Sequence, residues 1–334
     1  MSMIHPFDLG DSILVYRLQR QGMWLEPRYA LTGAEPPVWA ALSAPFRWWG
    51  RDVATYISRT AGGGIIQMRL RCDRAEADVV FLAPAVESND EIAAMWRGLL
   101  VHCARQAGNQ RVQRLYACVP EEASEILAQV RQVGFVRYTQ EEVYCLEQPA
   151  DVTLAAGPYE VRTPTAEDDW QLQKLRAAIT PQLVKQAEGA GGSHEGVQPL
   201  AERSSGDWGR LVLLRGEEIA GMLLVQPGRS GHCLRLWGDF RDDAEVLTLL
   251  QKGLASLEGY SHRPVYCLLR EYQGGVRPVL TRQGFEPTTT WSRLVKHTVV
   301  RAREPARRAW HALEPRPEPS VPGAIPSGAV TSDR

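Results

Sequence analysis

Two carboxylates and two phenols stand at matching places in the two halves of this sequence. Glu121 follows the apolar run that carries Tyr116, and Glu271 follows the run that carries Tyr266, 150 residues later in each case. A carboxylate can accept a proton from a nucleophile, and a phenol can return one to a leaving group. We therefore take Glu271, Tyr266 and Glu121 as candidate catalytic residues. The structural alternative is that the glutamates cap helices and the tyrosines pack within a sheet.

Other reactive side chains are weaker candidates for a catalytic or metal site. Glu141, Glu142 and Tyr144 belong to an extended run, where a solvated strand face is the favoured interpretation over an acceptor cleft. The seven histidines have no metal-ligand spacing, and the six cysteines are isolated from one another. We expect reduced cysteines that pack in the core, and no metal.

The matching places belong to a longer register. At an offset of 150 residues, Leu115–Cys118 matches Val265–Leu268, and Gly134-Phe135 matches Gly284-Phe285. Several matches in one register indicate a tandem duplication. The sequence therefore predicts a domain over 1–148, a linker over 149–157, a second domain over 158–300, and a tail over 301–334 that is rich in proline. The tail has few large apolar residues, so we expect it to be disordered.

The elements that position the candidates follow one plan in both copies. A mixed α/β fold is predicted, because short apolar runs alternate with helical periodicities. The first copy is predicted to contain strands at 13–16, 53–59, 65–71, 78–82, 111–119 and 135–146, and helices at 88–103 and 121–133. The second copy is predicted to contain strands at 160–162, 211–214, 219–225, 233–237, 264–269 and 285–295, and helices starting at 165, 181, 243 and 275.

This order of elements resembles the GNAT N-acetyltransferase superfamily. Arg215–Met222 is similar to that family's second hairpin, and Arg131–Phe135 and Arg282–Phe285 are similar to its last helix running into Gly-Phe. The resemblance covers about residues 10–148 and 158–298, and it implies two tandem acyl-CoA N-acyltransferase folds with acetyl-CoA as a substrate. It further implies that CoA lies along one strand and its following turn, with contacts from Leu234, Leu236, Trp237, Arg241 and Gln273.

Both copies depart from the family pattern. The phosphate-binding turn lacks its glycines, and the tyrosine expected to protonate the thiolate is Val130 in one copy and Leu280 in the other. Two interpretations stay open. One is an N-acyltransferase that acylates a small amine, and the other is a non-catalytic ligand-binding or scaffold protein. Since Arg241 is the cation in the second copy's acidic turn, that copy is favoured as the CoA site.

Net charge and the length of the apolar runs limit the classes of partner that the protein is expected to bind. The formal net charge is −1, from 38 basic and 39 acidic residues, which argues against nucleic-acid binding. The longest apolar run, residues 79–86, is far below the roughly 18–20 residues that span a bilayer. With no signal peptide at the N-terminus, we expect a cytoplasmic protein that binds a small amine or an acyl-CoA, and leave open whether it forms a homodimer.

Overall fold

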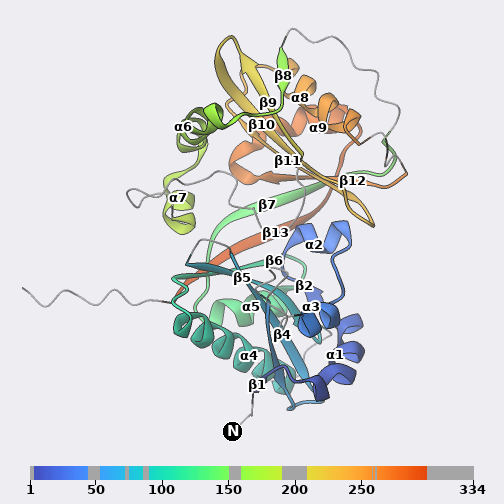
Figure 1. Cartoon of the computed structure of the whole chain (residues 1–334), viewed down its shortest axis with the longest axis vertical. Helices are drawn as coiled ribbons and strands as arrows, with labels where there is room; N and C mark the ends of the chain where they lie inside the picture. Colours follow the sequence, from blue (N-terminus) through green and yellow to red (C-terminus); the bar gives the residue numbers. More distant parts are fainter. Residues whose placement is uncertain are drawn as a thin grey trace, which may run out of the picture. The chain divides into compact units, whose positions relative to one another are not determined.

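The computed structural model describes residues 4–43, 53–71, 75–85, 90–149, 159–189, 209–257, 259 and 262–298. Its elements occur in the same order in both halves apart from a few short pieces (Figure 1). The first half contains β1 (Ile4–Pro6), α1 (Ser12–Leu18), β2 (Met23–Trp24), α2 (Pro27–Thr32), α3 (Pro37–Ser43), β3 (Val53–Ser58), β4 (Gly64–Leu70), β5 (Glu76–Ala83), α4 (Asp90–Asn109), β6 (Arg114–Pro120), α5 (Ser124–Gln132) and β7 (Val136–Leu146).

The second half repeats this order with differences at the helices and, among its described residues, without a counterpart of β2. It contains β8 (Glu160–Arg162), α6 (Asp169–Ile179), α7 (Gln182–Glu188), β9 (Gly209–Arg215), β10 (Glu218–Gln226), β11 (His232–Gly238), α8 (Asp243–Ala255), β12 (Val265–Arg270), the 3₁₀ segment η6 (Glu271–Val276), α9 (Arg277–Arg282) and β13 (Glu286–His297).

Local signals account for most of these elements. The residues expected on the inner face of α4, among them Trp96, Leu99 and Cys103, are buried as predicted. Gly134 and Gly284 follow α5 and α9 with φ of +94° and +82°, where glycine carries no steric penalty. The strand predicted at 13–16 is wrong. Those residues lie in α1, because Asp8 and Asp11 form a capping box that starts a helical segment ahead of them.

The strands of both halves form one continuous mixed sheet. Its order in the described part of the chain is β1-β3-β4-β5-β6-β13-β7-β12-β11-β10-β9-β8, with β2 attached to β5. Two pairs are parallel, β5 with β6 and β11 with β12, and they occupy matching places in the two halves. The helices α4 and α5 cover one half of the sheet, and α8 and α9 cover the other, each over its own hydrophobic core.

The closing strands are exchanged between the halves. β13 of the second half pairs with β6 and β7 of the first half, and β7 pairs with β12 and β13 of the second. Residues 1–299 consequently form a single compact unit. The repeated order of elements is visible in the fold, but each half uses a strand of the other to complete its part of the sheet. The boundaries predicted at 148 and 158 therefore stay predictions, and the linker, apart from Pro149, and the tail lie outside the described residues.

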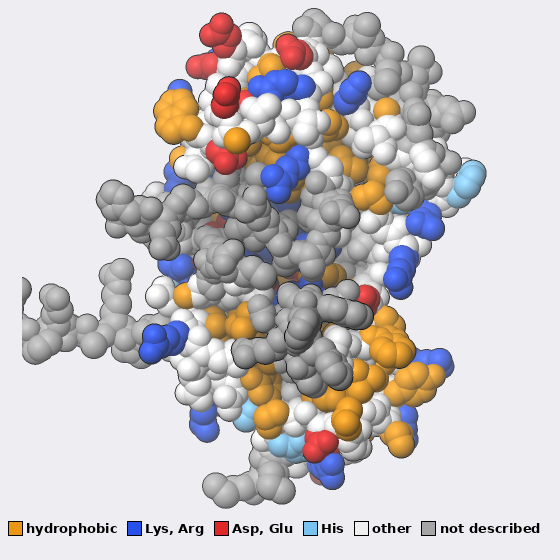
Figure 2. Space-filling view, viewed as in Figure 1, with side chains coloured by type: hydrophobic (Ala, Val, Ile, Leu, Met, Phe, Trp, Pro, Cys, Tyr) orange, Lys and Arg blue, Asp and Glu red, His pale blue; other side chains and the backbone are white. Residues whose placement is uncertain are grey.

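Five cysteines in the described part of the chain are reduced and buried, which confirms the expectation of core thiols. None of the helices described is long and apolar enough to cross a bilayer. Large exposed hydrophobic side chains include Ile13 and Tyr16 on α1 and Trp39 on α3. Figure 2 shows hydrophobic side chains gathered over this part of the first half. The homodimer stays a prediction.

Candidate active site

The parallel strands of the second half diverge partway along their length. β11 and β12 pair only where His232–Arg235 lie beside Val265–Leu268. Beyond that point, Leu236–Gly238 still pair with β10 on one side, while no described strand pairs with their other edge. The gap therefore presents backbone N–H and C=O groups that an extended ligand could bind.

The first half has the same divergence, but its own chain fills it. β5 and β6 pair only where Glu76–Val79 lie beside Arg114–Ala117. Beyond this, Met23 and Trp24 of β2 pair with β5, and the Leu25 N–H donates to the Val80 carbonyl at 2.8 Å. The Cys118 N–H donates to the Leu25 carbonyl at 3.1 Å, so the segment bridges both strands. The first half therefore has little backbone left there for a ligand.

A cavity lies at the mouth of the open divergence in the second half. The centre of a water molecule can occupy about 70 Å³ of this cavity. It is lined from three directions. The residues come from the α6–α7 region (Arg176, Ile179, Thr180, Glu188), from the sheet (Leu224, Arg235, Trp237, Arg270) and from η6 (Tyr272, Gln273).

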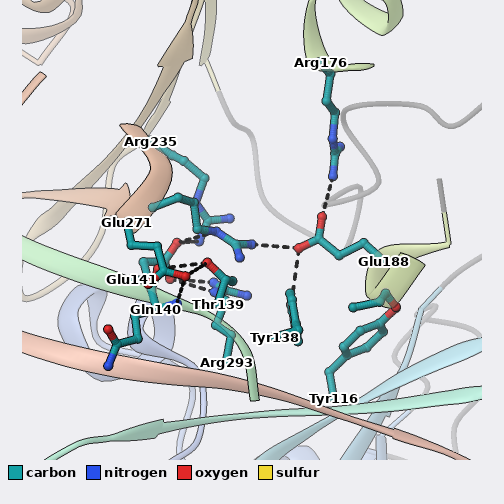
Figure 3. A network of polar contacts seen from close by, with 12 residues as sticks. Tyr116, Tyr138, Thr139, Gln140, Glu141, Arg176, Glu188, Arg235, Glu271 and Arg293 are labelled. Atoms are coloured by element: carbon teal, nitrogen blue, oxygen red, sulfur yellow. Dashed lines mark hydrogen bonds and ion pairs between the residues drawn. The ribbon is translucent and has the colours of Figure 1, made fainter. Parts of the chain in front are cut away.

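Glu188 joins the cavity to the exchanged strands. Its carboxylate accepts hydrogen bonds from Arg176 at 2.9 Å, from Arg270 at 3.0 Å and from the Tyr138 hydroxyl of β7 at 3.2 Å (Figure 3). Burial raises the pKa of this carboxyl, but Arg270 and Arg176 outweigh it and hold the pKa at about 2. Glu188 is therefore an ionised acceptor at neutral pH and a weak base.

Glu141 is the centre of a second group of charges next to the cavity. One of its carboxylate oxygens accepts from Arg293 at 2.6 Å, and the other lies 3.3 Å from Arg235 and 3.4 Å from Arg270 (Figure 3). Burial raises its pKa, yet Arg293, Arg235 and Arg270 bring it down to about 2. The expectation that Glu141 lies on a solvated face is wrong. It is 0% exposed, because the exchange places β7 in the middle of the sheet.

The candidate glutamates contact the closing strands. Glu271 accepts from the Thr139 hydroxyl at 3.0 Å and from the Gln140 N–H at 3.2 Å. Glu121 accepts from the Gln140 side chain at 3.0 Å and from Ser292. The hydrogen bond from Ser292 is the main cause of a lowered pKa at Glu121. Both glutamates therefore bind residues of the exchanged strands β7 and β13.

The described residues that line the cavity do not include Glu121, Glu271 or Tyr266. Tyr266 lies on β12 opposite Cys145, where burial first, and then the Cys145 and Glu147 groups, raise the pKa of its phenol. Catalytic roles for these three residues stay predictions.

The residues expected to contact CoA are divided between core and cavity. The side chains of Leu234 and Leu236 on β11 are fully buried. Of these two residues, only Leu236 has its backbone at the divergence. Trp237 and Gln273 both line the cavity. Arg241 lies exposed in the turn between β11 and α8.

That turn is closed by its own carboxylates. Asp242 accepts from the Glu245 N–H at 2.9 Å, and Glu245 accepts from the Arg241 N–H at 2.7 Å. Glu245 is buried and also paired with Arg215 at 2.6 Å. The N–H groups that would bind pyrophosphate in the family pattern are thus already engaged, so the turn does not fit that pattern. In the first half, the turn residues 86–89, with the expected cap Ser88, lie outside the described residues.

Sequence reasoning missed most of the cavity's polar residues, namely Arg176, Glu188, Arg235, Arg270 and Tyr272. One signal was available. Arg235 interrupts the apolar residues of the strand predicted at 233–237, and a charged residue buried in such a strand requires partners. Within the described part of the chain, no group of three or more His, Cys, Asp or Glu side chains could hold a metal ion.

No protein-family model matches this chain, and no curated protein does. Solved structures do. A tandem GNAT protein from the clavulanic acid biosynthesis pathway matches with a TM-score of 0.51 at 15% identity, over 90% of this chain and 99% of that one. A Drosophila protein matches with a TM-score of 0.50 at 12% identity, over 89% and 99%. A GCN5-related N-acetyltransferase from Sphaerobacter thermophilus matches with a TM-score of 0.49 at 14% identity, over 89% and 96%.

Proposed function

We propose that this chain, which has the tandem GNAT fold, is an N-acyltransferase whose second half binds an acyl-CoA and acylates a small amine. The observation that carries the proposal is the difference between the two divergences. In the first half, residues 21–25 occupy the gap between β5 and β6, while Leu236–Gly238 of the second half keep a free edge among the described residues. The amides of a pantetheine arm can bind that edge as an added strand does.

The cavity is suited to the transfer step. The amine nitrogen attacks the thioester carbonyl, the carbon–sulfur bond breaks, an amide forms, and the amine gives its surplus proton to solvent. The CoA thiolate must then take up a proton. Tyr272 lines the cavity, and burial is the main cause that raises the pKa of its phenol, so it is protonated at neutral pH. We assign it the role of proton donor in place of the family tyrosine, with solvent returning a proton to its phenolate after transfer.

The closed turn before α8 predicts weak CoA binding. Asp242 and Glu245 occupy the N–H groups that would otherwise bind pyrophosphate, and both carboxylates repel it. The exposed guanidinium of Arg241 is the cation best placed to offset this repulsion.

Titration with CoA and acetyl-CoA tests the proposal. Calorimetry should give one site per chain, and a ligand at 100 times its Kd should stabilise the fold by ~2.7 kcal/mol. Arg241→Glu should abolish binding, while Arg97→Glu, on α4 of the first half, serves as the matched control. Binding that survives Arg241→Glu but is lost in Arg97→Glu would move the site to the first half.

A non-catalytic ligand-binding protein is the second candidate. It is favoured by the closed turn and by Val130 and Leu280 at the places of the family tyrosine. This candidate predicts that neither CoA nor acetyl-CoA shifts the melting temperature.

A further inference from the structure

The wall of the cavity in the second half is unevenly charged. Among the described residues that line it, the three guanidinium groups of Arg176, Arg235 and Arg270 stand against one carboxylate, that of Glu188. Glu141 lies outside this lining, 3.3 Å from Arg235 and 3.4 Å from Arg270. The remaining wall includes the apolar side chains of Ile179, Leu224 and Trp237. Such a cavity favours a ligand that carries a negative charge at one end.

Two buried donors in this wall have no acceptor among the described residues. Arg270 directs Nη2 to Glu188 at 3.0 Å and Nε to Glu141 at 3.4 Å, but its Nη1 has no hydrogen-bond partner there. The Nε2 of Gln273 also has no hydrogen-bond partner among the described residues. Most buried polar atoms in folded proteins are hydrogen-bonded, so two unsatisfied donors at one cavity indicate a place for an acceptor from outside the chain.

We propose that the acylated amine also carries a carboxylate, which is held by Arg270 and Gln273. This inference rests on the proposed acyltransferase function and names its acceptor class. Both side chains line the one cavity, and a planar guanidinium together with a carboxamide can donate to the two oxygens of a carboxylate. The amine then points toward Trp237, at the end of β11 where the divergence opens. The 70 Å³ available corresponds to roughly five waters at ~10–15 Å³ each, which is enough room for a small amino acid.

Matched acceptors test the charge requirement. The full chain is given acetyl-CoA and a panel of small α-, β- and γ-amino acids, each beside its own carboxamide, and each rate is corrected for the fraction of neutral amine. The acids should exceed their carboxamides at least tenfold in kcat/KM. An aminoalkylphosphonate in the same panel shows whether the requirement is for a carboxylate or for any anion, and a phosphonate that matches the acids would overturn the carboxylate assignment.

Gln273→Glu tests the location. The new carboxylate should lower kcat/KM, through KM, at least tenfold more for the acids than for their carboxamides. Gln273→Met removes the donor without adding charge and should cost the acids less. Gln283→Glu, at the end of α9 and outside the residues lining the cavity, is the control. Melting curves confirm that all three variants fold.

The outcomes separate the two proposals. Transfer that favours the carboxamides, or that Gln273→Glu leaves unchanged, overturns the acceptor class and leaves the acyltransferase standing. If no acyl-CoA binds, the acyltransferase fails, and the free amino acids are tested alone. A rise in melting temperature that Gln273→Glu removes supports the anion site, and the absence of any rise overturns it.

Discussion

The backbone N–H of Cys118 on β6 donates a hydrogen bond to the carbonyl of Leu25, 93 residues earlier in the chain, at 3.1 Å. Leu25 in turn donates to Val80 of β5 at 2.8 Å, so one residue bridges two strands that no longer pair with each other. The second half has no such bridge among its described residues. Two copies of one fold thus differ at the place where the fold offers a ligand its backbone.

Gly22→Val should dislodge the bridging segment. A Cβ added to Gly22 would overlap the Phe81 ring, so the segment or the ring must move. Overpacking of this kind costs about 1–3 kcal/mol, which urea denaturation can measure. Gly10→Ala is the control, since nothing lies within 4 Å of its added Cβ. Equal stability of Gly22→Val and the parent chain would show that residues 21–25 do not support the first half.

Tyr272→Phe should lower kcat for acyl transfer by about 10²-fold or more and leave the KM for acyl-CoA nearly unchanged, because general acid catalysis acts in the transition state. Tyr16→Phe, on an exposed face of α1, should change neither constant. A parallel loss of kcat in both variants, or none in Tyr272→Phe, would remove the tyrosine from the mechanism.

Acid should destabilise the protein through Glu141. Its pKa is about 2 in the folded chain against an ordinary value of 4.5, so the unfolded chain binds more protons between these values. The contribution of Glu141, on the order of 3 kcal/mol, is complete above pH 4.5 and is lost as the pH falls toward 2. Unfolding free energies at pH 7 and pH 3 measure the difference.

Glu141→Gln should remove the share of that acid dependence due to Glu141, leave the share due to Glu188, and destabilise the chain at neutral pH. Arg293, Arg235 and Arg270 would then lie buried without their shared carboxylate, and breaking a buried ion pair costs about 3–5 kcal/mol. Glu217→Gln, at an exposed turn, should leave the pH dependence as it is. An acid slope as steep in Glu141→Gln as in the parent chain would exclude Glu141 as a cause of the acid dependence.

The two halves, produced as separate polypeptides 1–148 and 158–298, should fold only together. Residues 1–148 alone leave β6 without β13 and β7 without β12, and exposed strand edges promote aggregation. Co-expressed halves should purify as a one-to-one complex that melts cooperatively. A soluble, cooperatively melting 1–148 fragment would show that the first copy is a domain in its own right.

The sequence by itself determined most of the elements from residue 53 onward and their repetition, but not α1, β2, α2 and α3. The helical spacing of Trp96, Leu99 and Cys103 predicted the buried face of α4, and Gly134 and Gly284 predicted where α5 and α9 end. The capping pair Thr165 and Asp168 likewise predicted the start of the first helical segment in the second half, and the structure confirms it. These features depend on residues within a few positions of one another, so a single sequence contains them in full.

Only the tertiary structure decided which strands pair and what the buried charges contact. The alternation of side chains along β7 shows that it is a strand but not that β12 and β13 flank it, because a strand's partners are set by distant residues. Glu141 and Arg293 are 152 residues apart, and Glu188 and Arg270 are 82 apart. The cavity is lined by residues of α6, α7, β10, β11, β12 and η6, so only the folded chain brings them together.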